Sequence, residues 1–400
     1  MSHGTETVRN PGPLKLNPSM TKLFIGLSVV GIGALAVGIA TNAERGWTSL
    51  LFNHFFFMSL ALGGLFICAI QFLTSAMWSA PVRRLAESFA AYLPVVLIAF
   101  LAIALGGGVP HLFSWANPEV VKGDVILEHK ASYLNVTFFI VRNLIAIALW
   151  FFFRGKLVGN SVAQDANGDV LYTNRNKVIA PLFLVIFALS LTMSAIDLLM
   201  SLDPHWFSTM FGVYAFAGLF TTSLATMTIF AILLRRNGML KGIVNDNHLH
   251  DCGKFMFAFT IFWAYIAFSQ FMLIWYANLP EETMYFMHRM EGNWKYVTIF
   301  LLVGKFMIPF FALLPREAKR SETRLLKVAI WMLFAHWIDL IWIVQPEFFK
   351  DGPRVGWIEV AGFVGFAGLF GFLTTRFLSQ NNVVAIRDPK LVESVFHHHQ

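Results

Sequence analysis

LFNHFFFMSLALGGLFICAIQFLTSAM, at residues 51–77, contains no Asp, Glu, Lys or Arg over its whole length. A helix of about 20 apolar residues crosses the roughly 30 Å hydrocarbon layer of a bilayer, so this stretch predicts a transmembrane helix. The same criterion, applied outward along the chain, finds nine more stretches, at about 22–40, 87–108, 133–153, 178–200, 208–234, 255–277, 294–314, 326–345 and 356–376. The predicted fold class is therefore an all-α integral membrane protein with about ten transmembrane helices.

The composition of the chain supports this fold class. Of its 400 residues, 57% are hydrophobic and only 13% are charged, with 42 Phe and 12 Trp. This share of hydrophobic residues exceeds what a soluble domain uses to fill its core, so the additional hydrophobic side chains must face lipid. We expect residues 1–21 to form an N-terminal tail with no cleavable signal peptide, residues 22–376 the membrane domain, and residues 377–400 a C-terminal tail.

The distribution of basic residues predicts the orientation of the spans. The two tails and the even-numbered loops carry 21 Lys and Arg, and the odd-numbered loops carry 7; the remaining two of the 30 are Arg142 and Lys305, inside spans. Because cytoplasmic loops are enriched in Lys and Arg, both termini are predicted to be cytoplasmic. The longest predicted connections, 109–132 outside and 154–177 and 235–254 inside, are too short to form a separate domain.

Four ionisable side chains fall well inside the predicted spans, where the free-energy cost of burying them makes them functional candidates: Arg142, Lys305, His336 and Asp339. A further candidate, Asp197, lies about one turn from the outer end of its span. His336 and Asp339 are three residues apart and therefore share a helix face. Proton routes through membranes use such groups, so we interpret these two residues as part of a proton relay. For Arg142 and Lys305, an equally good interpretation is that each pairs with a carboxylate and holds helices together.

Two weaker candidates, His54 and Glu359, are predicted near the outer ends of their spans, where water reaches. A haem held by two histidines needs them at matching depth on facing helices. Because His54 and His336 are predicted at different depths, we expect no haem. Cys68 and Cys252 are too few for a disulfide framework or an iron–sulfur cluster, so the chain is expected to carry no metal or redox centre.

Two polar stretches lie at the predicted outer ends of spans. The first, SAIDLLMSLDPHWFSTMFGVY at 194–214, brings Asp197, Asp203 and His205 to one junction, and helix capping explains one acid but not all three together. The second, FWAYIAFSQFMLIWYANLPEETMYFMHRMEGNW at 262–294, contributes the weaker candidates Tyr265, Ser269 and Tyr276. Aromatic residues also form belts at membrane interfaces, so those tyrosines have a simpler explanation.

These two stretches closely resemble the F-subunit (ActF-type) group of the NrfD/PsrC family of membrane subunits, which is found in bacterial alternative complex III. The resemblance extends over the ten-span layout. It implies a fold of two four-helix bundles, spans two to five and six to nine, flanked by spans one and ten. It also implies a respiratory role in the bacterial cytoplasmic (inner) membrane, as part of a quinol:cytochrome c oxidoreductase complex.

The partners implied by the resemblance are a paralogous NrfD/PsrC-type membrane subunit, an iron–sulfur protein and c-type cytochrome subunits, with a terminal oxidase as a further partner. Iron–sulfur clusters and haem c are expected in those partners. Whether this chain binds quinol or quinone is left open. A proton-conducting role is implied for the F-subunit group, and the candidate residues for that path are Asp197, Asp203, His205, Arg142, Lys305, His336 and Asp339. Oxidation of a quinol releases two protons and two electrons, and this chain has residues for the protons only.

Two other functions fit the same residues. A secondary ion transporter would also use intramembrane Arg142, Lys305 and Asp339, although the broken, paired half-helices of many transporters are weak in this sequence. A purely structural anchor would tolerate exchange of the buried ionisable residues for apolar ones of similar volume.

Overall fold

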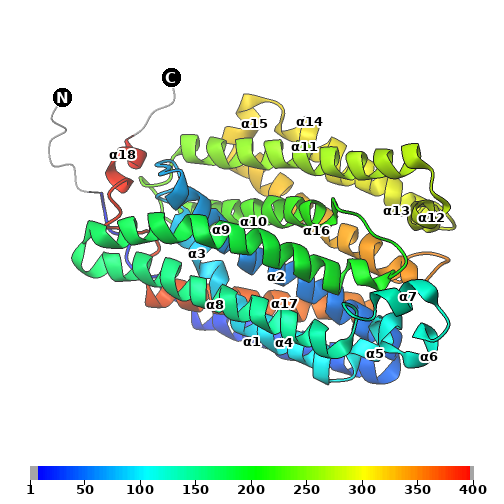
Figure 1. Cartoon of the computed structure of the whole chain (residues 1–400). Helices are drawn as coiled ribbons and strands as arrows, with labels where there is room; N and C mark the ends of the chain where they lie inside the picture. The colour runs from blue at the N-terminus through cyan, green and yellow to red at the C-terminus, as the bar shows by residue number, and fades with distance from the viewer. Residues whose placement is uncertain (1–7, 397–400) are drawn as a thin grey trace.

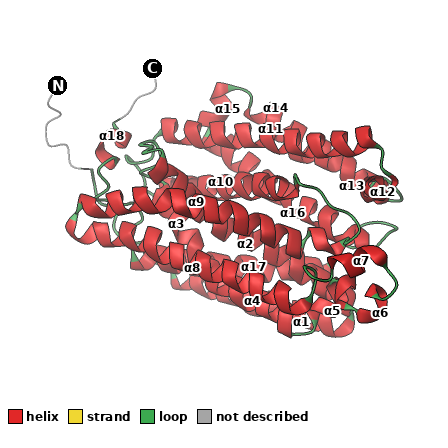
Figure 2. Ribbon diagram, viewed as in Figure 1, coloured by secondary structure: helices red, strands yellow, loops and turns green. Residues whose placement is uncertain are grey.

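The fold is entirely helical over residues 8–396, which are the residues that the structure, a computed structural model, describes. Figure 2 shows helices joined by short loops, and the only β pairing in this range is an isolated bridge between Pro13 and Asn382. Ten helical segments are long and apolar enough to cross a membrane. The predicted fold class is therefore confirmed, and the protein is a multi-pass membrane protein.

Six of the ten spans are single helices and four combine two or three helical segments. The single ones are α1 (Pro18–Thr41), α2 (Ala43–Leu73), α8 (Val136–Asn167), α10 (Phe211–Arg236), α11 (Asp246–Ala277) and α17 (Trp357–Gln380). The composite ones are α3 (Arg83–Phe89) with η1 (Ala90–Tyr92) and α4 (Leu93–Leu105), α9 (Val170–Leu198) with η3 (Met200–Leu202), α13 (Trp294–Phe300) with η4 (Leu301–Met307) and α14 (Ile308–Leu313), and α16 (Glu322–Val344) with η5 (Gln345–Glu347).

Short helices lie outside the spans. They are α5 (Gly108–Leu112), η2 (Ser114–Ala116), α6 (Pro118–Val121), α7 (Val125–Lys130), α12 (Pro280–His288), α15 (Arg316–Arg320) and α18 (Leu391–Val395). In Figure 1, α5, α6, α7 and α12 gather at one end of the bundle, and α18 lies at the other end, where the described part of the chain begins and ends. We call these the opposite end and the terminal end; the distribution of Lys and Arg predicts that the terminal end is cytoplasmic.

The stretch 154–177 differs from its prediction as a loop. Helix α8 continues to Asn167 and α9 begins at Val170, so the two are joined only by a tight turn at Gly168, which has a φ of +73°. An apolar run predicts only the part of a helix that lies in the hydrocarbon layer. Outside that layer a helix can continue with polar residues. The two helices therefore extend past the membrane at the terminal end.

The core lies around α2 and α10. In each, 83% of the most apolar window is buried inside the protein, against 22% for α1. Helix α1 packs along α17, and a Cβ added at Gly31 would lie only 2.3 Å from the backbone nitrogen of Gly365. Glycine at Gly31 is what permits this close approach of the first and last spans.

Candidate functional site

A concentrated polar group inside the membrane domain joins three spans. The Lys305 ammonium donates to the Asp339 carboxylate and lies 3.0 Å from Nδ1 of His336. On the other side, the Tyr214 hydroxyl donates to Oδ1 of Asp339. Each of these four side chains is at most 6% exposed. We call Tyr214, Lys305, His336 and Asp339 the buried relay.

Pairing of Lys305 with a carboxylate is confirmed by this geometry, as is the contact between His336 and Asp339, whose Nδ1 and Oδ2 atoms lie 3.5 Å apart. Pairing and proton transfer are not exclusive, because a hydrogen-bonded chain of titratable groups can do both. The geometry of the buried relay is therefore compatible with both interpretations that the sequence offers for these residues.

An irregular segment of span eight presents Lys305 to its partners. Residues 301–307 form η4, a π-helical turn inside an otherwise α-helical span. Pro309 has no N–H to donate to the carbonyl of Lys305, four residues earlier, so the α-helical ladder is interrupted there. The carbonyl of Gly304 instead accepts a hydrogen bond of 2.6 Å from the Trp331 indole. π-helical turns are rare and occur often at functional sites.

A glycine on α10 makes room for the His336 ring. A Cβ added at Gly218 would lie 2.4 Å from Cε1 of His336. Gly218, Lys305 and His336 also line a void of about 10 Å³, together with three threonines of α10 and α11: Thr221, Thr222 and Thr260. A void of this size holds about one water molecule. Nε2 of His336 is buried without a hydrogen-bond partner among the described residues, so such a water would satisfy it.

We expect Gly218→Ala to displace His336 and to lower the free energy of unfolding by about 1–3 kcal/mol, the usual cost of overpacking. Gly155→Ala on α8 is the matched control, because a Cβ there meets nothing within 4 Å and alanine favours a helix. Equilibrium unfolding in mixed micelles measures both. Equal stability of the two variants would contradict the close packing of His336 on α10.

A cavity of about 220 Å³ adjoins the buried relay on the side of Tyr214 and Trp263. Its wall is mostly aromatic and aliphatic, from α10, α11, α12, η4 and α16, with Gln270 and Arg289 among its few polar groups. Phe268 and Leu302 line it and are themselves 61% and 59% exposed, so the cavity has an edge on the lipid-facing surface between α11 and η4.

Arg289 closes this cavity toward the opposite end, and sequence reasoning placed it only in a loop. Its guanidinium lies 3.4 Å from the centre of the Tyr285 ring. It donates to the carbonyls of Tyr285 and Ile343, each at 2.9 Å, and of Trp342 at 3.2 Å. Trp206 stacks on the Tyr285 ring, and the two ring centres are 3.7 Å apart.

Arg142 and Asp197 form a second, separate cluster between α8 and α9. Arg142 donates to both Asp197 oxygens, at 3.1 and 2.8 Å, and to the carbonyl of Tyr133 at 2.8 Å. Asn143 donates to the same carboxylate at 2.8 Å, and the guanidinium lies 4.2 Å from the centre of the Phe138 ring. The predicted pairing of Arg142 with a carboxylate is thus confirmed, and it shares no residue with the buried relay.

The other two candidates of the first polar stretch, Asp203 and His205, bind elsewhere than at Asp197. Nε2 of His205 lies 2.6 Å from Oδ2 of Asp124 in an ion pair that solvent reaches. The pKa of Asp124 is lowered because the Leu127 amide and the His205 ring both bind its carboxylate. Asp203 accepts from the Trp206 amide at 3.3 Å, as a loop residue.

The weaker candidates of the second stretch face outward from α11. Tyr265 is 63% exposed and Tyr276 86% exposed, and Ser269 is half-buried between them. They lie where lipid or a partner subunit would cover them. None of the three lines the cavity beside the buried relay.

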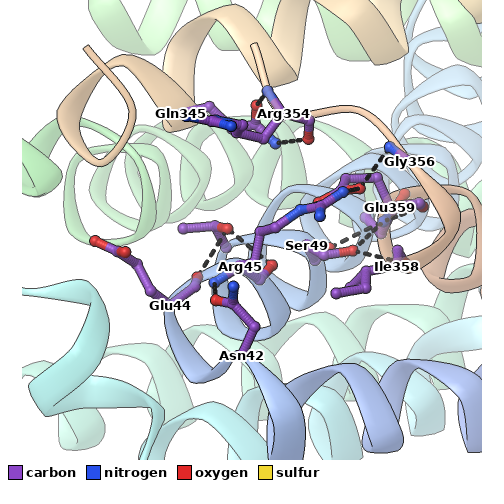
Figure 3. Close-up of polar contacts among 11 residues, drawn as sticks. Asn42, Glu44, Arg45, Ser49, Gln345, Arg354, Gly356, Ile358 and Glu359 are labelled. Carbon is purple, nitrogen blue, oxygen red and sulfur yellow. Dashed lines mark hydrogen bonds and ion pairs between the residues drawn. The ribbon is translucent and has the colours of Figure 1, made fainter. Parts of the chain in front are cut away.

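Glu359 is buried in a clamp between α2 and α17 rather than open to water (Figure 3). Arg45 donates to its two oxygens at 2.8 and 2.6 Å, and the Gly356 amide donates at 2.7 Å, which caps α17. Ser49 adds a bond of 3.2 Å to the Ile358 carbonyl. These contacts fasten the start of α2 to the start of α17.

His54 is completely buried in α2, whereas the sequence predicts it near water. Its depth in the core follows from the central place of α2, which the order of spans along the chain does not reveal. Neither ring nitrogen has a hydrogen-bond partner among residues 8–396. Within that range there is also no group of three or more His, Cys, Asp or Glu that could hold a metal ion.

Comparison of the whole sequence with known protein families found no matching family model, and comparison with curated proteins found no match either.

Proposed function

We propose that this chain is a membrane subunit of a respiratory quinol:electron-acceptor oxidoreductase complex and contributes a proton path through the buried relay. The observation that supports this proposal most is that four buried side chains are hydrogen-bonded together inside the membrane domain and adjoin an apolar cavity: Tyr214, Lys305, His336 and Asp339. The chain contributes no redox centre in this proposal, so it is not catalytic alone.

The arrangement of hydrogen bonds within the buried relay suits proton transfer. A proton arriving at Asp339 has three neighbours within one hydrogen bond or ion pair: Tyr214, Lys305 and His336. The buried carboxylate and ammonium compensate each other, so gain or loss of one proton leaves an uncompensated charge and drives the next transfer. Chains of such groups are the usual proton routes in membrane proteins.

The adjoining cavity suits contacts with quinol or quinone. Apolar pockets with a few placed polar groups are typical of sites for lipophilic small molecules. The lipid-facing edge at Phe268 and Leu302 would admit such a molecule from the bilayer. Quinol oxidation releases two protons and two electrons; the protons would reach Tyr214, and the electrons would pass to iron–sulfur and c-haem centres of partner subunits.

The further parts of the proposal rest on the resemblance of the two polar stretches. The partners would be a paralogous NrfD/PsrC-type membrane subunit, an iron–sulfur protein and c-type cytochrome subunits. The membrane would be the bacterial inner membrane, with both termini in the cytoplasm. A secondary ion transporter is the second candidate, because a buried Lys–Asp pair also suits ion-coupled transport.

Substitution Asp339→Asn in the purified complex tests the proposal. In proteoliposomes that are supplied with a quinol, we expect the rate at which protons appear, per folded complex, to fall about 10²-fold. This is the size of effect typical of removing a proton-transfer group. Asp351→Asn, at an exposed position of the opposite end, is the control. Unchanged proton appearance in Asp339→Asn would refute the relay, and ion flux through the isolated chain would favour the transporter.

A further inference from the structure

A second feature of the membrane domain, unrelated to the buried relay, is a pair of hollows along α9. At the terminal end lies a pocket of about 160 Å³ lined by basic, polar and apolar side chains, and farther along α9 lies an apolar hollow of about 190 Å³. We call these the head pocket and the tail hollow. Helix α9 lines both, together with α2 and the C-terminal segment in the head pocket and with α10 and Phe66 of α2 in the tail hollow.

The head pocket lies at the depth of lipid head groups. Its α9 residues, among them Thr173, Asn174 and Lys177, immediately precede the apolar run that begins at Val178. Val178 is 77% exposed and faces outward, as a lipid-contacting residue does. On α2, the pocket is lined by Gln71, close to the end of that helix at Leu73.

The charges in the head pocket favour an anion. Arg83 and Asp388 both line it, and they neutralise each other through an ion pair. Lys390 reaches it from the C-terminal segment and pairs with exposed Glu393. Lys177 is exposed and makes no ion pair with any residue in the range 8–396, so its charge is available to a ligand.

The head pocket also has a polar acceptor without a partner. Oε1 of Gln71 is buried and accepts no hydrogen bond from the described residues, and the residue is only 7% exposed. A buried acceptor without a donor costs about 1–3 kcal/mol, so a ligand that brings a hydroxyl donor would be favoured. A phosphoglycerol head group has both an anionic phosphate and hydroxyl donors.

The tail hollow continues the face of α9 that lines the head pocket. On α9, Lys177, Leu184 and Ala188 are spaced seven and four residues apart and so lie on one face. Leu184, Ala188 and Phe66 of α2 line the hollow together with Phe216 of α10. From Lys177 to Ala188, the rise along α9 is about 16 Å, close to the half-thickness of about 15 Å of the hydrocarbon layer.

We propose that the head pocket and the tail hollow together bind one anionic phospholipid of the leaflet at the terminal end. Its phosphate lies beside Lys177 and Lys390, its head-group hydroxyl donates to Gln71, and an acyl chain occupies the tail hollow. Basic pockets between spans on the cytoplasmic side are typical sites for anionic head groups, and the predicted orientation places the head pocket on that side. The inference is independent of the proposed function.

The test measures lipid binding to the full-length chain in nanodiscs or mixed micelles, by native mass spectrometry and by thermal unfolding. We expect phosphatidylglycerol to be retained and to raise the unfolding temperature more than phosphatidylcholine does, because a ligand that binds only the folded state stabilises it. Lys177→Glu should weaken phosphatidylglycerol binding at least about fivefold, the effect of one basic residue near the membrane surface.

Lys156→Glu is the charge control. Lys156 is exposed on α8 at a similar height, because its neighbour Leu157 accepts a hydrogen bond of 2.9 Å from Asn176 of α9, and it does not line the head pocket. Ala188→Trp should fill the tail hollow and weaken binding of either lipid. Val185→Trp, at a lipid-facing position of α9 that is 61% exposed and outside the hollow, should leave binding unchanged.

Several results would overturn this inference. Equal stabilisation by the two lipids would exclude recognition of the head group. An equal loss in Lys177→Glu and Lys156→Glu would indicate general surface attraction rather than a site. The same stabilisation by inorganic phosphate alone, with no effect of Ala188→Trp, would show that the head pocket binds a free anion and that the hollow takes no acyl chain.

Discussion

Substitution Asp339→Leu lowers the free energy of unfolding by about 3–5 kcal/mol, because it leaves the ammonium of Lys305 buried without its carboxylate. Lys305 is 6% exposed and Asp339 is completely buried, so bulk water does not reach the ammonium to replace the lost carboxylate. The remaining neighbours of the ammonium are Nδ1 of His336 at 3.0 Å and the Trp263 ring, whose centre is 4.3 Å away, and neither carries a compensating formal negative charge. Equilibrium unfolding of the purified chain in mixed micelles measures this loss.

The double variant Lys305→Met/Asp339→Leu should regain most of that stability, because replacing a buried ion pair by apolar residues of similar volume is often neutral or stabilising. It should not regain proton transfer. This combination separates a relay from a structural clamp, since a clamp requires only that the helices stay packed. A double variant as unstable as Asp339→Leu alone would show that Lys305 and Asp339 do not depend on each other.

Substitution Asp197→Leu should also cost about 3–5 kcal/mol, since it leaves the guanidinium of Arg142 without the carboxylate that binds two of its nitrogens. Here we expect the quinol-driven activity per folded complex to be retained. The reason is that Arg142 and Asn143 both hold the Asp197 carboxylate in fixed contacts, and no nitrogen of Arg142 is left without a partner among the described residues.

The unfolding midpoint and the quinol-driven proton appearance, each measured on the same preparation of Asp197→Leu, check this prediction. Asp169→Leu serves as control for loss of a carboxylate at an exposed helix cap, where the expected cost is about 1 kcal/mol. Loss of proton appearance in the folded Asp197→Leu complex would place Asp197 on the proton path, as the sequence first suggests.

The spans and their number could be predicted from the sequence, because a lipid environment requires long apolar runs and excludes charge from most of them. Arg142, Lys305 and Asp339 were identifiable as buried for the same reason. Their partners were only partly identifiable: His336 and Asp339 share one helix, so spacing alone brings them together. Nothing in an apolar run states which helices are neighbours, so the meeting of Lys305 with Asp339 across two spans could not be derived.

Tyr214 and Arg289 show a different limit. Both lie inside the two polar stretches, yet Tyr214 resembles any aromatic residue of a membrane span and Arg289 resembles a basic residue of a loop. Arg289 is 1% exposed because Tyr285, Trp342 and three carbonyl groups surround it. The nearest sequence signal was an arginine within an aromatic-rich segment, which favours cation–π contacts.

Purification of this chain from its native membranes in a mild detergent, with subunit identification and with haem and iron analysis, tests the proposed function most directly. The proposal predicts stoichiometric haem c and iron–sulfur proteins in the purified material, together with quinol:cytochrome c or similar acceptor activity. A lone protein without cofactors or such activity would contradict it, and the buried Lys305–Asp339 pair would then be tested as part of an ion transporter in liposomes.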